Sequence, residues 1–242
     1  MSRLVSAVAV LSYPNIFTPR PLNEKDLAAG KAPKYQAAFV FLPSEDPAVI
    51  AQYKAMKQAA IDIARAKWAT KLAGNISLRA LDTEHGMANF LVSEDGDFRI
   101  RLPWRDDASV LRKKGYPEGS FFFNASTLHK PQVVTQIPYP VGHVRAGKPM
   151  PLEDESMMRA GALVVASLDP YAYEGSSNGV TFGLGNLQYI GAGDPDVIGA
   201  SAGANASDEF SADASVVADL SDVGADEAPA AAGDDITDLL GG

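Results

Sequence analysis

The sequence predicts a mainly β protein, in which a small β-barrel carries one long helix and is followed by a disordered acidic tail. Three observations carry this prediction. One segment with helical periodicity stands against about six or seven strand-like segments. Strands come first and last in this body, and the composition changes abruptly after residue 193. Such strands close most simply as the antiparallel barrel of an OB fold or as a sandwich, and periodicity alone does not decide between them.

The N-terminal segments predict two strands joined by a long loop. Residues 4–13 are rich in Val, Ala and Leu, which indicates a buried strand that Pro14 ends. Residues 15–33 contain three prolines and no hydrophobic period, so we expect a loop there. Residues 34–42 place apolar side chains at both odd and even positions, which predicts a strand buried largely on both faces.

A long helix should follow this second strand. Ser44 or Asp46 can cap its free amide groups, and Pro47 suits its first turn. We expect the helix to continue to about residue 72 and to pack on the sheet. Its apolar face repeats at helical spacing and consists of Val49, Tyr53, Met56, Ala60, Ile63, Ala64 and Trp68.

The remaining body alternates irregular and strand-like segments. Residues 74–119 mix glycines, prolines and charges, so we expect long loops there around a short strand at residues 98–102. The glycine- and serine-rich residues 174–179 predict a hairpin turn. Apolar alternation predicts further strands at residues 120–126, 132–136, 162–168 and 180–190.

The formal net charge of -9 hides two parts of opposite sign. Residues 194–242 hold 12 acidic side chains and no Lys, Arg or His, which leaves residues 1–193 with 18 acidic and all 21 basic side chains, a net charge of +3. The last part is also rich in Ala, Gly and Ser and nearly free of aromatic residues. We therefore expect a mildly basic domain at 1–193 and a disordered acidic tail at 194–242.

Motifs for catalysis are weak, and we expect no enzyme activity, no catalytic residue, no metal site and no cofactor. The chain contains no cysteine, its three histidines lie far apart, and neither dinucleotide-binding nor Walker-type glycine patterns occur. The acidic pairs Asp95/Asp97 and Asp106/Asp107 sit among charged loop residues, where solvated surface is the usual outcome. No apolar run approaches the roughly 20 residues that span a bilayer. We expect a protein of a reducing cytoplasm that does not use a membrane.

Basic and aromatic residues interleave in one part of the body, and this pattern suits single-stranded nucleic acid. Cations neutralise phosphates, while flat rings stack on unpaired bases for about 1–3 kcal/mol each. Trp104, between Arg101 and Arg105, is the leading stacking candidate, although about half of the aromatic residues should belong to the core. The cluster consists of Arg99, Arg101, Trp104, Arg105, Arg112, Lys113, Lys114 and Tyr116, and the secondary candidates are Tyr13, Phe17, Tyr171 and Tyr173.

The acidic tail predicts regulation. A tethered polyanion competes with phosphate for a basic groove and so weakens non-specific binding until a long strand displaces it. The end of the tail places apolar residues at i, i+3 and i+4 among acids, which suits a protein partner. The residues of this partner-binding segment are Asp234, Asp235, Ile236, Asp238, Leu239 and Leu240.

Blocks spread over residues 3–193 resemble the phage-encoded single-stranded DNA-binding proteins with an OB fold. The blocks are LSYPNIF at 11–17, PKY at 33–35, AKW at 66–68, LPWRD at 102–106, FFNAS at 122–126, PQVV at 131–134 and GVTFGLGNLQ at 179–188. The resemblance implies binding of single strands during phage DNA replication and recombination in the host cell cytoplasm. It also implies an acidic C-terminus that contacts replication or recombination proteins.

Two other classes remain open from the sequence. A strand-rich body with a flexible acidic tail also suits a structural or assembly protein of a virion. A metal-dependent nuclease would use the pairs around Asp106. The sequence is also compatible with a homodimer.

Overall fold

The structure is a computed structural model, and it describes residues 3–21, 27–84, 86–175 and 177–198. All of the elements named below lie in the compact unit Met1–Ala202, which we call the body. The expected partner-binding segment lies outside the described residues, and its members are Asp234, Asp235, Ile236, Asp238, Leu239 and Leu240.

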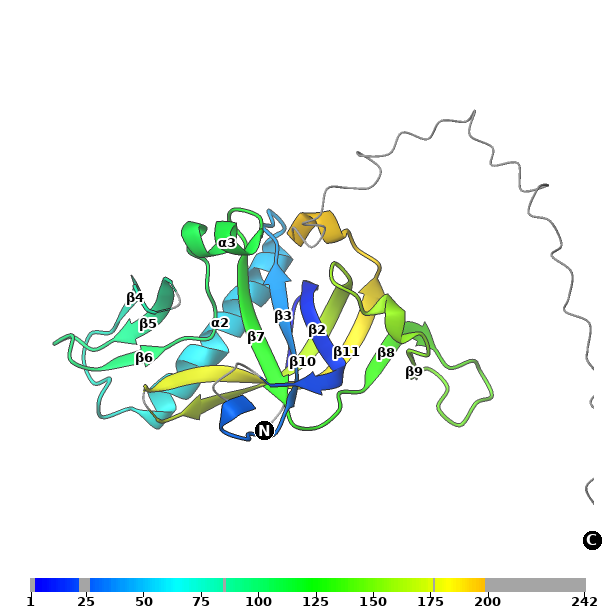
Figure 1. Cartoon of the computed structure of the whole chain (residues 1–242), viewed down its shortest axis with the longest axis horizontal. Coiled ribbons are helices and arrows are strands. Elements are labelled where there is room, and N and C mark those ends of the chain that lie inside the picture. The colour runs from blue at the N-terminus through cyan, green and yellow to red at the C-terminus, as the bar shows by residue number, and fades with distance from the viewer. Residues whose placement is uncertain (1–2, 22–26, 85, 176, 199–242) are drawn as a thin grey trace, which may run out of the picture. The chain divides into compact units, whose positions relative to one another are not determined.

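The body is mainly β, as the sequence predicts. In the described part of the chain an 11-stranded sheet runs in the order β1-β10-β2-β3-β7-β11-β6-β5-β4, with β8 and β9 attached beside β11 (Figure 1). The strands are β1 (Leu4–Val5), β2 (Ala9–Arg20), β3 (Lys34–Phe41), β4 (Ser77–Leu81), β5 (Ala88–Val92), β6 (Arg99–Arg101), β7 (Phe121–Thr127), β8 (Val133–Pro138), β9 (Pro149–Pro151), β10 (Leu163–Tyr173) and β11 (Gly179–Gly191).

Five of these strands form a closed path of pairings around the main core. The path runs β2-β3-β7-β11-β10 and returns to β2, and every pair in it is antiparallel except β7 with β11. Each strand sends fully buried apolar side chains into one cluster, because alternate residues of a strand point to the same face. Representative members are Leu11, Phe39, Phe123, Leu168 and Phe182.

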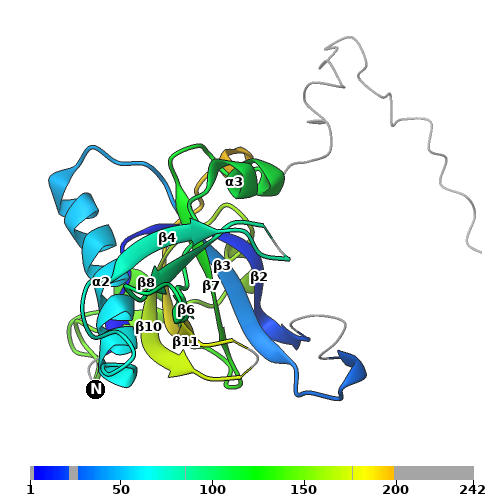
Figure 2. The same cartoon turned by 90° about the vertical axis from the view of Figure 1, so that its left-hand side faces the viewer.

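The long helix is confirmed, and it is shorter than expected. Helix α2 (Pro47–Lys67) begins where Asp46 accepts a hydrogen bond from the Ala48 amide at 2.8 Å. It buries Met56, Ala60 and Ala64 and runs along one side of the strands (Figure 2). It ends at Lys67, because Trp68 leaves the helical conformation and buries its ring in the core. None of the helices in the described ranges is long and apolar enough to cross a membrane.

The expected end of the first strand at Pro14 is wrong. Strand β2 continues through Pro14 to Arg20, so part of the expected loop at 15–33 is strand. Tyr13 adopts a positive φ of 46°, and the register with β3 shifts between Ser12 and Asn15. This irregularity is a β-bulge, which accommodates a proline because a bulged residue donates no ladder hydrogen bond.

The expectation of long loops at 74–119 is also wrong. Strands β4 and β5 form an antiparallel hairpin, β6 extends it, and helix α3 (Ala108–Lys114) follows. Helix α3 begins where Asp107 accepts the Ser109 amide at 3.0 Å and ends at Gly115 in the left-handed region. Strand β4 buries no residue, so no core-facing set of apolar side chains marks it in the sequence. This hairpin lies at one end of the body (Figure 1).

The C-terminal strands of the body are confirmed. β7, β8, β10 and β11 cover the predicted segments, and β10 pairs with β11 as an antiparallel hairpin around residues 174–178. The short helices η1 (Glu155–Met157) and η2 (Pro195–Ile198) were not predicted. Ile198 is buried in a second cluster with Val10 and Val40, so the packed body extends five residues beyond the expected boundary at 193.

Candidate nucleic-acid interface

Two hollows open on the face of the closed strands that turns away from the main core. One, of about 180 Å³, is bordered by Tyr13 and Lys114, and we call it the Lys114 hollow. The other, of about 160 Å³, is bordered by Arg101, Arg105 and Tyr173, and we call it the Arg105 hollow. Asn124 on β7 lines both, so the two hollows adjoin on one surface, which we call the shared face.

The floor of the shared face follows from strand register. Phe121 and Phe123 point into the main core, so Asn124 between Phe123 and Ala125 points outward and is exposed. Asn124 pairs with Ala38 on β3, and Ala38 pairs with Ser12 on β2. Asn124 and Ala38 line the Lys114 hollow, and their short side chains let a ligand approach the sheet closely there, whereas Ser12 is buried.

Two arginines of like charge meet in the Arg105 hollow. Arg105 is fixed to β7 by a pair of backbone hydrogen bonds with Phe122, at 2.9 and 3.0 Å. Burial lowers the pKa of Arg105, and the positive charge of Arg101 lowers it further. Among the described residues no carboxylate forms an ion pair with Arg101. An anion placed between the two guanidinium groups would relieve their repulsion, and a phosphate fits their fork geometry.

Tyr173 borders the Arg105 hollow and Tyr171 lies two residues before it on β10, and a glycine lies beneath each ring. Tyr173 pairs with Gly179, where an added Cβ would lie only 2.7 Å from Cε1 of the tyrosine ring. Cε1 of Tyr171 would lie 3.6 Å from a Cβ at Gly183. Burial raises the pKa of Tyr171, and the neighbouring Tyr173 raises it further, so the phenol stays neutral. Both rings therefore present flat surfaces over bare backbone.

The hairpin that carries these tyrosines is tied to the end of α2. Glu174 follows Tyr173 and accepts a hydrogen bond from Nε1 of Trp68 at 3.1 Å. Its other oxygen lies 3.5 Å from Nζ of Lys67. The contact fixes the hairpin tip and with it the position of the Tyr173 ring.

The Lys114 hollow pairs a cation with an exposed ring. The bulge in β2 turns Tyr13 outward, leaving 62% of it exposed, and Asn15 Nδ2 donates to the Tyr13 carbonyl at 3.4 Å. Lys114, in the last turn of α3, places Nζ 5.3 Å from the Tyr13 ring centroid. This is cation–π distance, and it leaves an aromatic face and a charge side by side at the surface.

The predicted stacking role of Trp104 is wrong. Trp104 is 2% exposed and belongs to the main core, and Lys57 Nζ lies 5.4 Å from its ring centroid. Tyr116 is also unavailable, at 5% exposure, because its hydroxyl donates to Ser12 Oγ at 3.0 Å while its ring packs edge-on against Phe122. Tyr116 instead packs in the second cluster with Phe122 and covers Ser12.

The other predicted residues do not line either hollow. Arg99 is exposed on β6, and Arg112 and Lys113 are exposed on α3. Phe17 packs against the main core with Lys130 Nζ at 5.5 Å from its ring. The contacts of Asn124 and Thr181 with the hollows were missed by sequence reasoning. The outward position of Asn124, next to the alternating phenylalanines, was the available signal.

The acidic pairs considered for a nuclease have structural partners. Asp106 forms an ion pair with Lys57 at 3.2 Å and accepts a hydrogen bond from Asn89 at 2.7 Å. Hydrogen bonds lower the pKa of Asp107, from Ser109 at the start of α3, and of Asp95, from Ser93 in a turn. In the described ranges no group of three His, Asp or Glu side chains gathers where it could hold a metal ion.

A mainly β body with cations and exposed rings around a low polar floor defines a class of protein that holds a flexible polyanion against a sheet. The family model described as "Enterobacter phage Enc34, ssDNA-binding protein" matches residues 3–220. The chain therefore belongs to this family of phage single-stranded DNA-binding proteins, as the sequence blocks indicate.

Three solved structures give comparable distant matches. The single-stranded DNA-binding protein from bacteriophage Enc34 in a C-terminally truncated form is 16% identical, with 79% of this chain and 86% of that chain covered and a TM-score of 0.47. The same phage's protein in complex with ssDNA is 15% identical, with 78% and 85% covered and a TM-score of 0.46. The single-stranded DNA-binding protein gp2.5 of bacteriophage T7 is 11% identical, with 79% and 92% covered and a TM-score of 0.44. A comparison with curated proteins finds no match.

Proposed function

We propose that this chain binds single-stranded DNA with little sequence preference on its shared face. It would protect and organise single strands during phage DNA replication and recombination. The observation that carries the proposal is the juxtaposition of Arg101 and Arg105, two like charges in a half-buried hollow beside Tyr173. A phosphate neutralises both cations, and the nearby ring stacks on the attached base.

The strand path joins the two hollows. One nucleotide contacts Tyr13 and Lys114, the backbone crosses Asn124, and a phosphate further along the strand reaches Arg101 and Arg105. Stacking uses the face that every base has, at about 1–3 kcal/mol per base, so the order of bases matters little. Arg99, Phe17, Arg112 and Lys113 remain predicted contacts for longer strands, which extend past the two hollows.

The body that carries this face is, in the same proposal, an OB-type barrel. The closed path of five strands supports it, since such a barrel pairs its five strands in a ring. Helix α2 covers the main core at one side of this ring.

The tail expected from residue 194 begins, in our proposal, after Ile198, and it forms a disordered regulatory segment. The ten acidic side chains after Ile198 compete with DNA for the basic side chains of the body, and the apolar residues at the end of the tail recruit replication or recombination proteins. The protein works without enzymatic activity or cofactor, in the cytoplasm of the host cell.

A titration of oligothymidine against duplex DNA over a salt series tests the proposed activity. We expect preference for the single strand and an affinity that falls steadily as salt rises, because bound phosphates release counterions. Equal binding to both forms, insensitive to salt, would contradict the proposal.

A further inference from the structure

The strands β8 and β9 and the turn between them, residues 133–151, form an arm with a fixed tip. The Tyr139 amide donates to the Lys148 carbonyl at 2.8 Å, and the Gly147 amide donates to the Tyr139 carbonyl at 3.2 Å. The Ala146 amide donates to the His143 carbonyl at 2.9 Å, and the His143 ring stacks on Tyr139 with centroids 4.3 Å apart. The tip therefore has one shape, held by its own backbone.

This fixed tip exposes apolar side chains. Val141 and Val144 are completely exposed, and Ile137 at the end of β8 is mostly exposed. His143, Arg145 and Lys148 lie around the valines and make the tip basic. An ordered turn with two solvent-exposed valines indicates a contact surface, because the backbone hydrogen bonds of the turn do not require apolar side chains at these positions.

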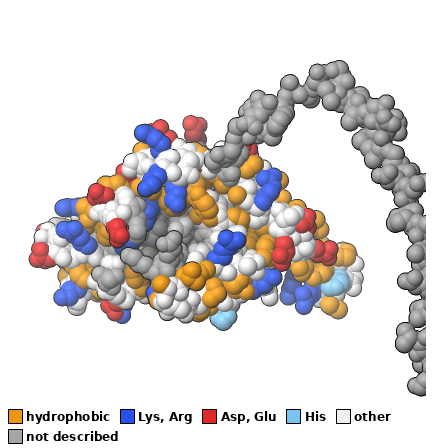
Figure 3. All heavy atoms as spheres, in the orientation of Figure 1, with side chains coloured by type: hydrophobic (Ala, Val, Ile, Leu, Met, Phe, Trp, Pro, Cys, Tyr) orange, Lys and Arg blue, Asp and Glu red, His pale blue; other side chains and the backbone are white. Residues whose placement is uncertain are grey.

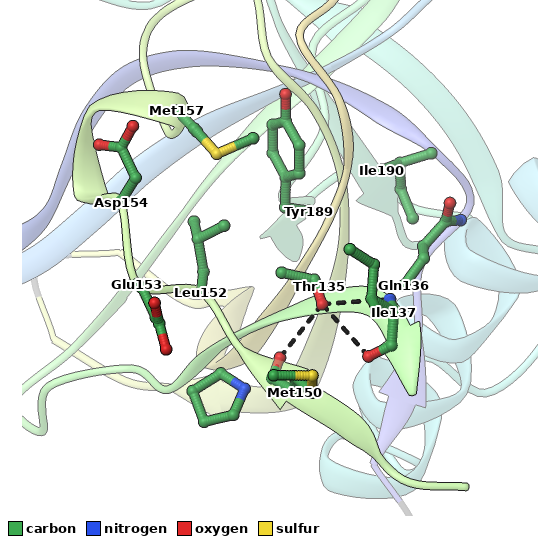
Figure 4. Close-up of a pocket in the computed structure, with 11 residues that line it drawn as sticks. Thr135, Gln136, Ile137, Met150, Leu152, Glu153, Asp154, Met157, Tyr189 and Ile190 are labelled. Carbon is green, nitrogen blue, oxygen red and sulfur yellow. Dashed lines mark hydrogen bonds between the residues drawn. The ribbon is translucent and has the colours of Figure 1, made fainter. Parts of the chain in front are cut away.

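A groove of about 450 Å³ lies at the base of the arm, and we call it the arm groove. Thr135 Oγ1 accepts the Ile137 amide at 3.1 Å and lies 3.4 Å from the Ile137 and Met150 carbonyl oxygens, so this hydroxyl in the wall is occupied. Glu153 and Asp154 border the groove. Apolar side chains surround it (Figure 4), among them Leu152, Met157, Tyr189 and Ile190.

Tip and groove are complementary in chemistry, and they sit at opposite ends of one arm. The tip is apolar and basic, whereas the groove is apolar and bordered by acids; basic and acidic side chains gather at this end of the body (Figure 3). About five residues of extended chain separate them, roughly 15 Å, so a tip does not reach its own groove. Two arms placed antiparallel about a two-fold axis satisfy both contacts at once.

We propose that two copies of this chain pair through their arms, with each tip seated in the partner's arm groove. Val141 and Val144 fill the apolar part, while Arg145 and Lys148 face Glu153 and Asp154. Backbone pairing of the two β9 edges is blocked, because Pro149 and Pro151 donate no hydrogen bond. The contact is therefore made by side chains. The arm lines neither hollow of the shared face, so pairing does not use the residues proposed to hold DNA.

Sedimentation velocity of the full chain without DNA, over a wide concentration range, tests this pairing independently of the proposed function. We expect a dimer that dissociates on dilution. The double variant Val141→Asp/Val144→Asp should stay monomeric, whereas Leu78→Asp on β4, an equally apolar exposed position outside the arm, should still dimerise. Circular dichroism confirms that each variant is folded.

Charge reversal makes the test specific for the proposed partners. Lys148→Glu and Glu153→Lys should each weaken the dimer about threefold to fivefold, and their combination should restore it. A full chain that stays monomeric at every concentration overturns the proposal. Binding of the tip elsewhere on its own chain would give this result. A dimer insensitive to the valine variants also overturns it. If those variants remain dimeric and lose DNA affinity, the arm is a DNA contact instead.

Discussion

Arg105→Gln separates DNA binding from folding more sharply than any other single change. The substitution removes one of two like charges in the Arg105 hollow and keeps a side chain of similar reach. A charge-assisted hydrogen bond to phosphate is worth about 1.5–3 kcal/mol, and the half-exposed position of Arg105 reduces this to about 1–2 kcal/mol. We therefore expect affinity for oligothymidine at low salt to fall roughly 5- to 30-fold.

Two further quantities test this explanation, the salt dependence of binding and the melting temperature. The slope of log K against log salt should shrink by about 0.7, the value for one phosphate contact on a single strand. The melting temperature should stay within about 3 °C of the wild-type value, because the two backbone hydrogen bonds between Arg105 and Phe122 do not depend on the side chain. Fluorescence anisotropy over a salt series and a thermal melt measure both quantities.

The matched control is Arg79→Gln on β4. Arg79 is exposed and lines neither hollow, yet its removal changes the net charge equally. If Arg79→Gln weakens binding as much as Arg105→Gln does, the effect is one of overall charge. In that case, or if Arg105→Gln binds like the wild type with an unchanged salt slope, the reasoning about the hollow is refuted.

Four other outcomes are expected. Gly179→Ala should displace the Tyr173 ring and lower oligothymidine affinity about threefold to tenfold in the same anisotropy assay, with little change in melting temperature. Trp104→Ala should lower the free energy of unfolding by about 3–5 kcal/mol in a urea titration, since the ring is core. Stopping the chain near residue 206 should tighten DNA binding most at low salt, where charge attraction is least screened. Affinity should not fall between about pH 7 and pH 9, because the raised pKa of Tyr171 keeps its phenol neutral beside phosphates; a decline in that range would contradict it.

Sequence patterns within a few residues predicted the elements that depend only on neighbouring residues. Asp46 and Pro47 mark the start of α2, because a cap and a first-turn proline act within a few residues of each other. Residues 34–42 predict β3 because its two buried faces are both apolar. The same local rules gave the wrong end for β2, since Pro14 ends strands in most contexts. Only the pairing with β3 shows that this strand continues past the bulge at Tyr13.

The candidate site was predicted in part, and its errors have one cause. Arg101, Arg105, Lys114, Tyr13 and Tyr173 all border the two hollows, as the charge and aromatic pattern suggests. Trp104 has the same sequence neighbourhood, yet its ring is buried.

Which side of the chain a ring occupies depends on strand pairing. Arg105 pairs with Phe122, which lies 17 positions further along the sequence, and no residue near Trp104 predicts that pairing. The residues of the floor were missed because small polar side chains on a strand carry no chemical signal of their own. Their role comes from the cations and rings that other elements place around them.

Photochemical cross-linking of a bromouracil-substituted oligonucleotide to the full chain, mapped by mass spectrometry, tests the location of the bound strand most directly. The account predicts cross-links at Tyr13 or Tyr173, whose rings line the two hollows, or at Tyr171, which lies two residues before Tyr173 on β10. Cross-links confined to the β4–β5 hairpin or to the β8–β9 arm, with these three tyrosines unmodified, would contradict it.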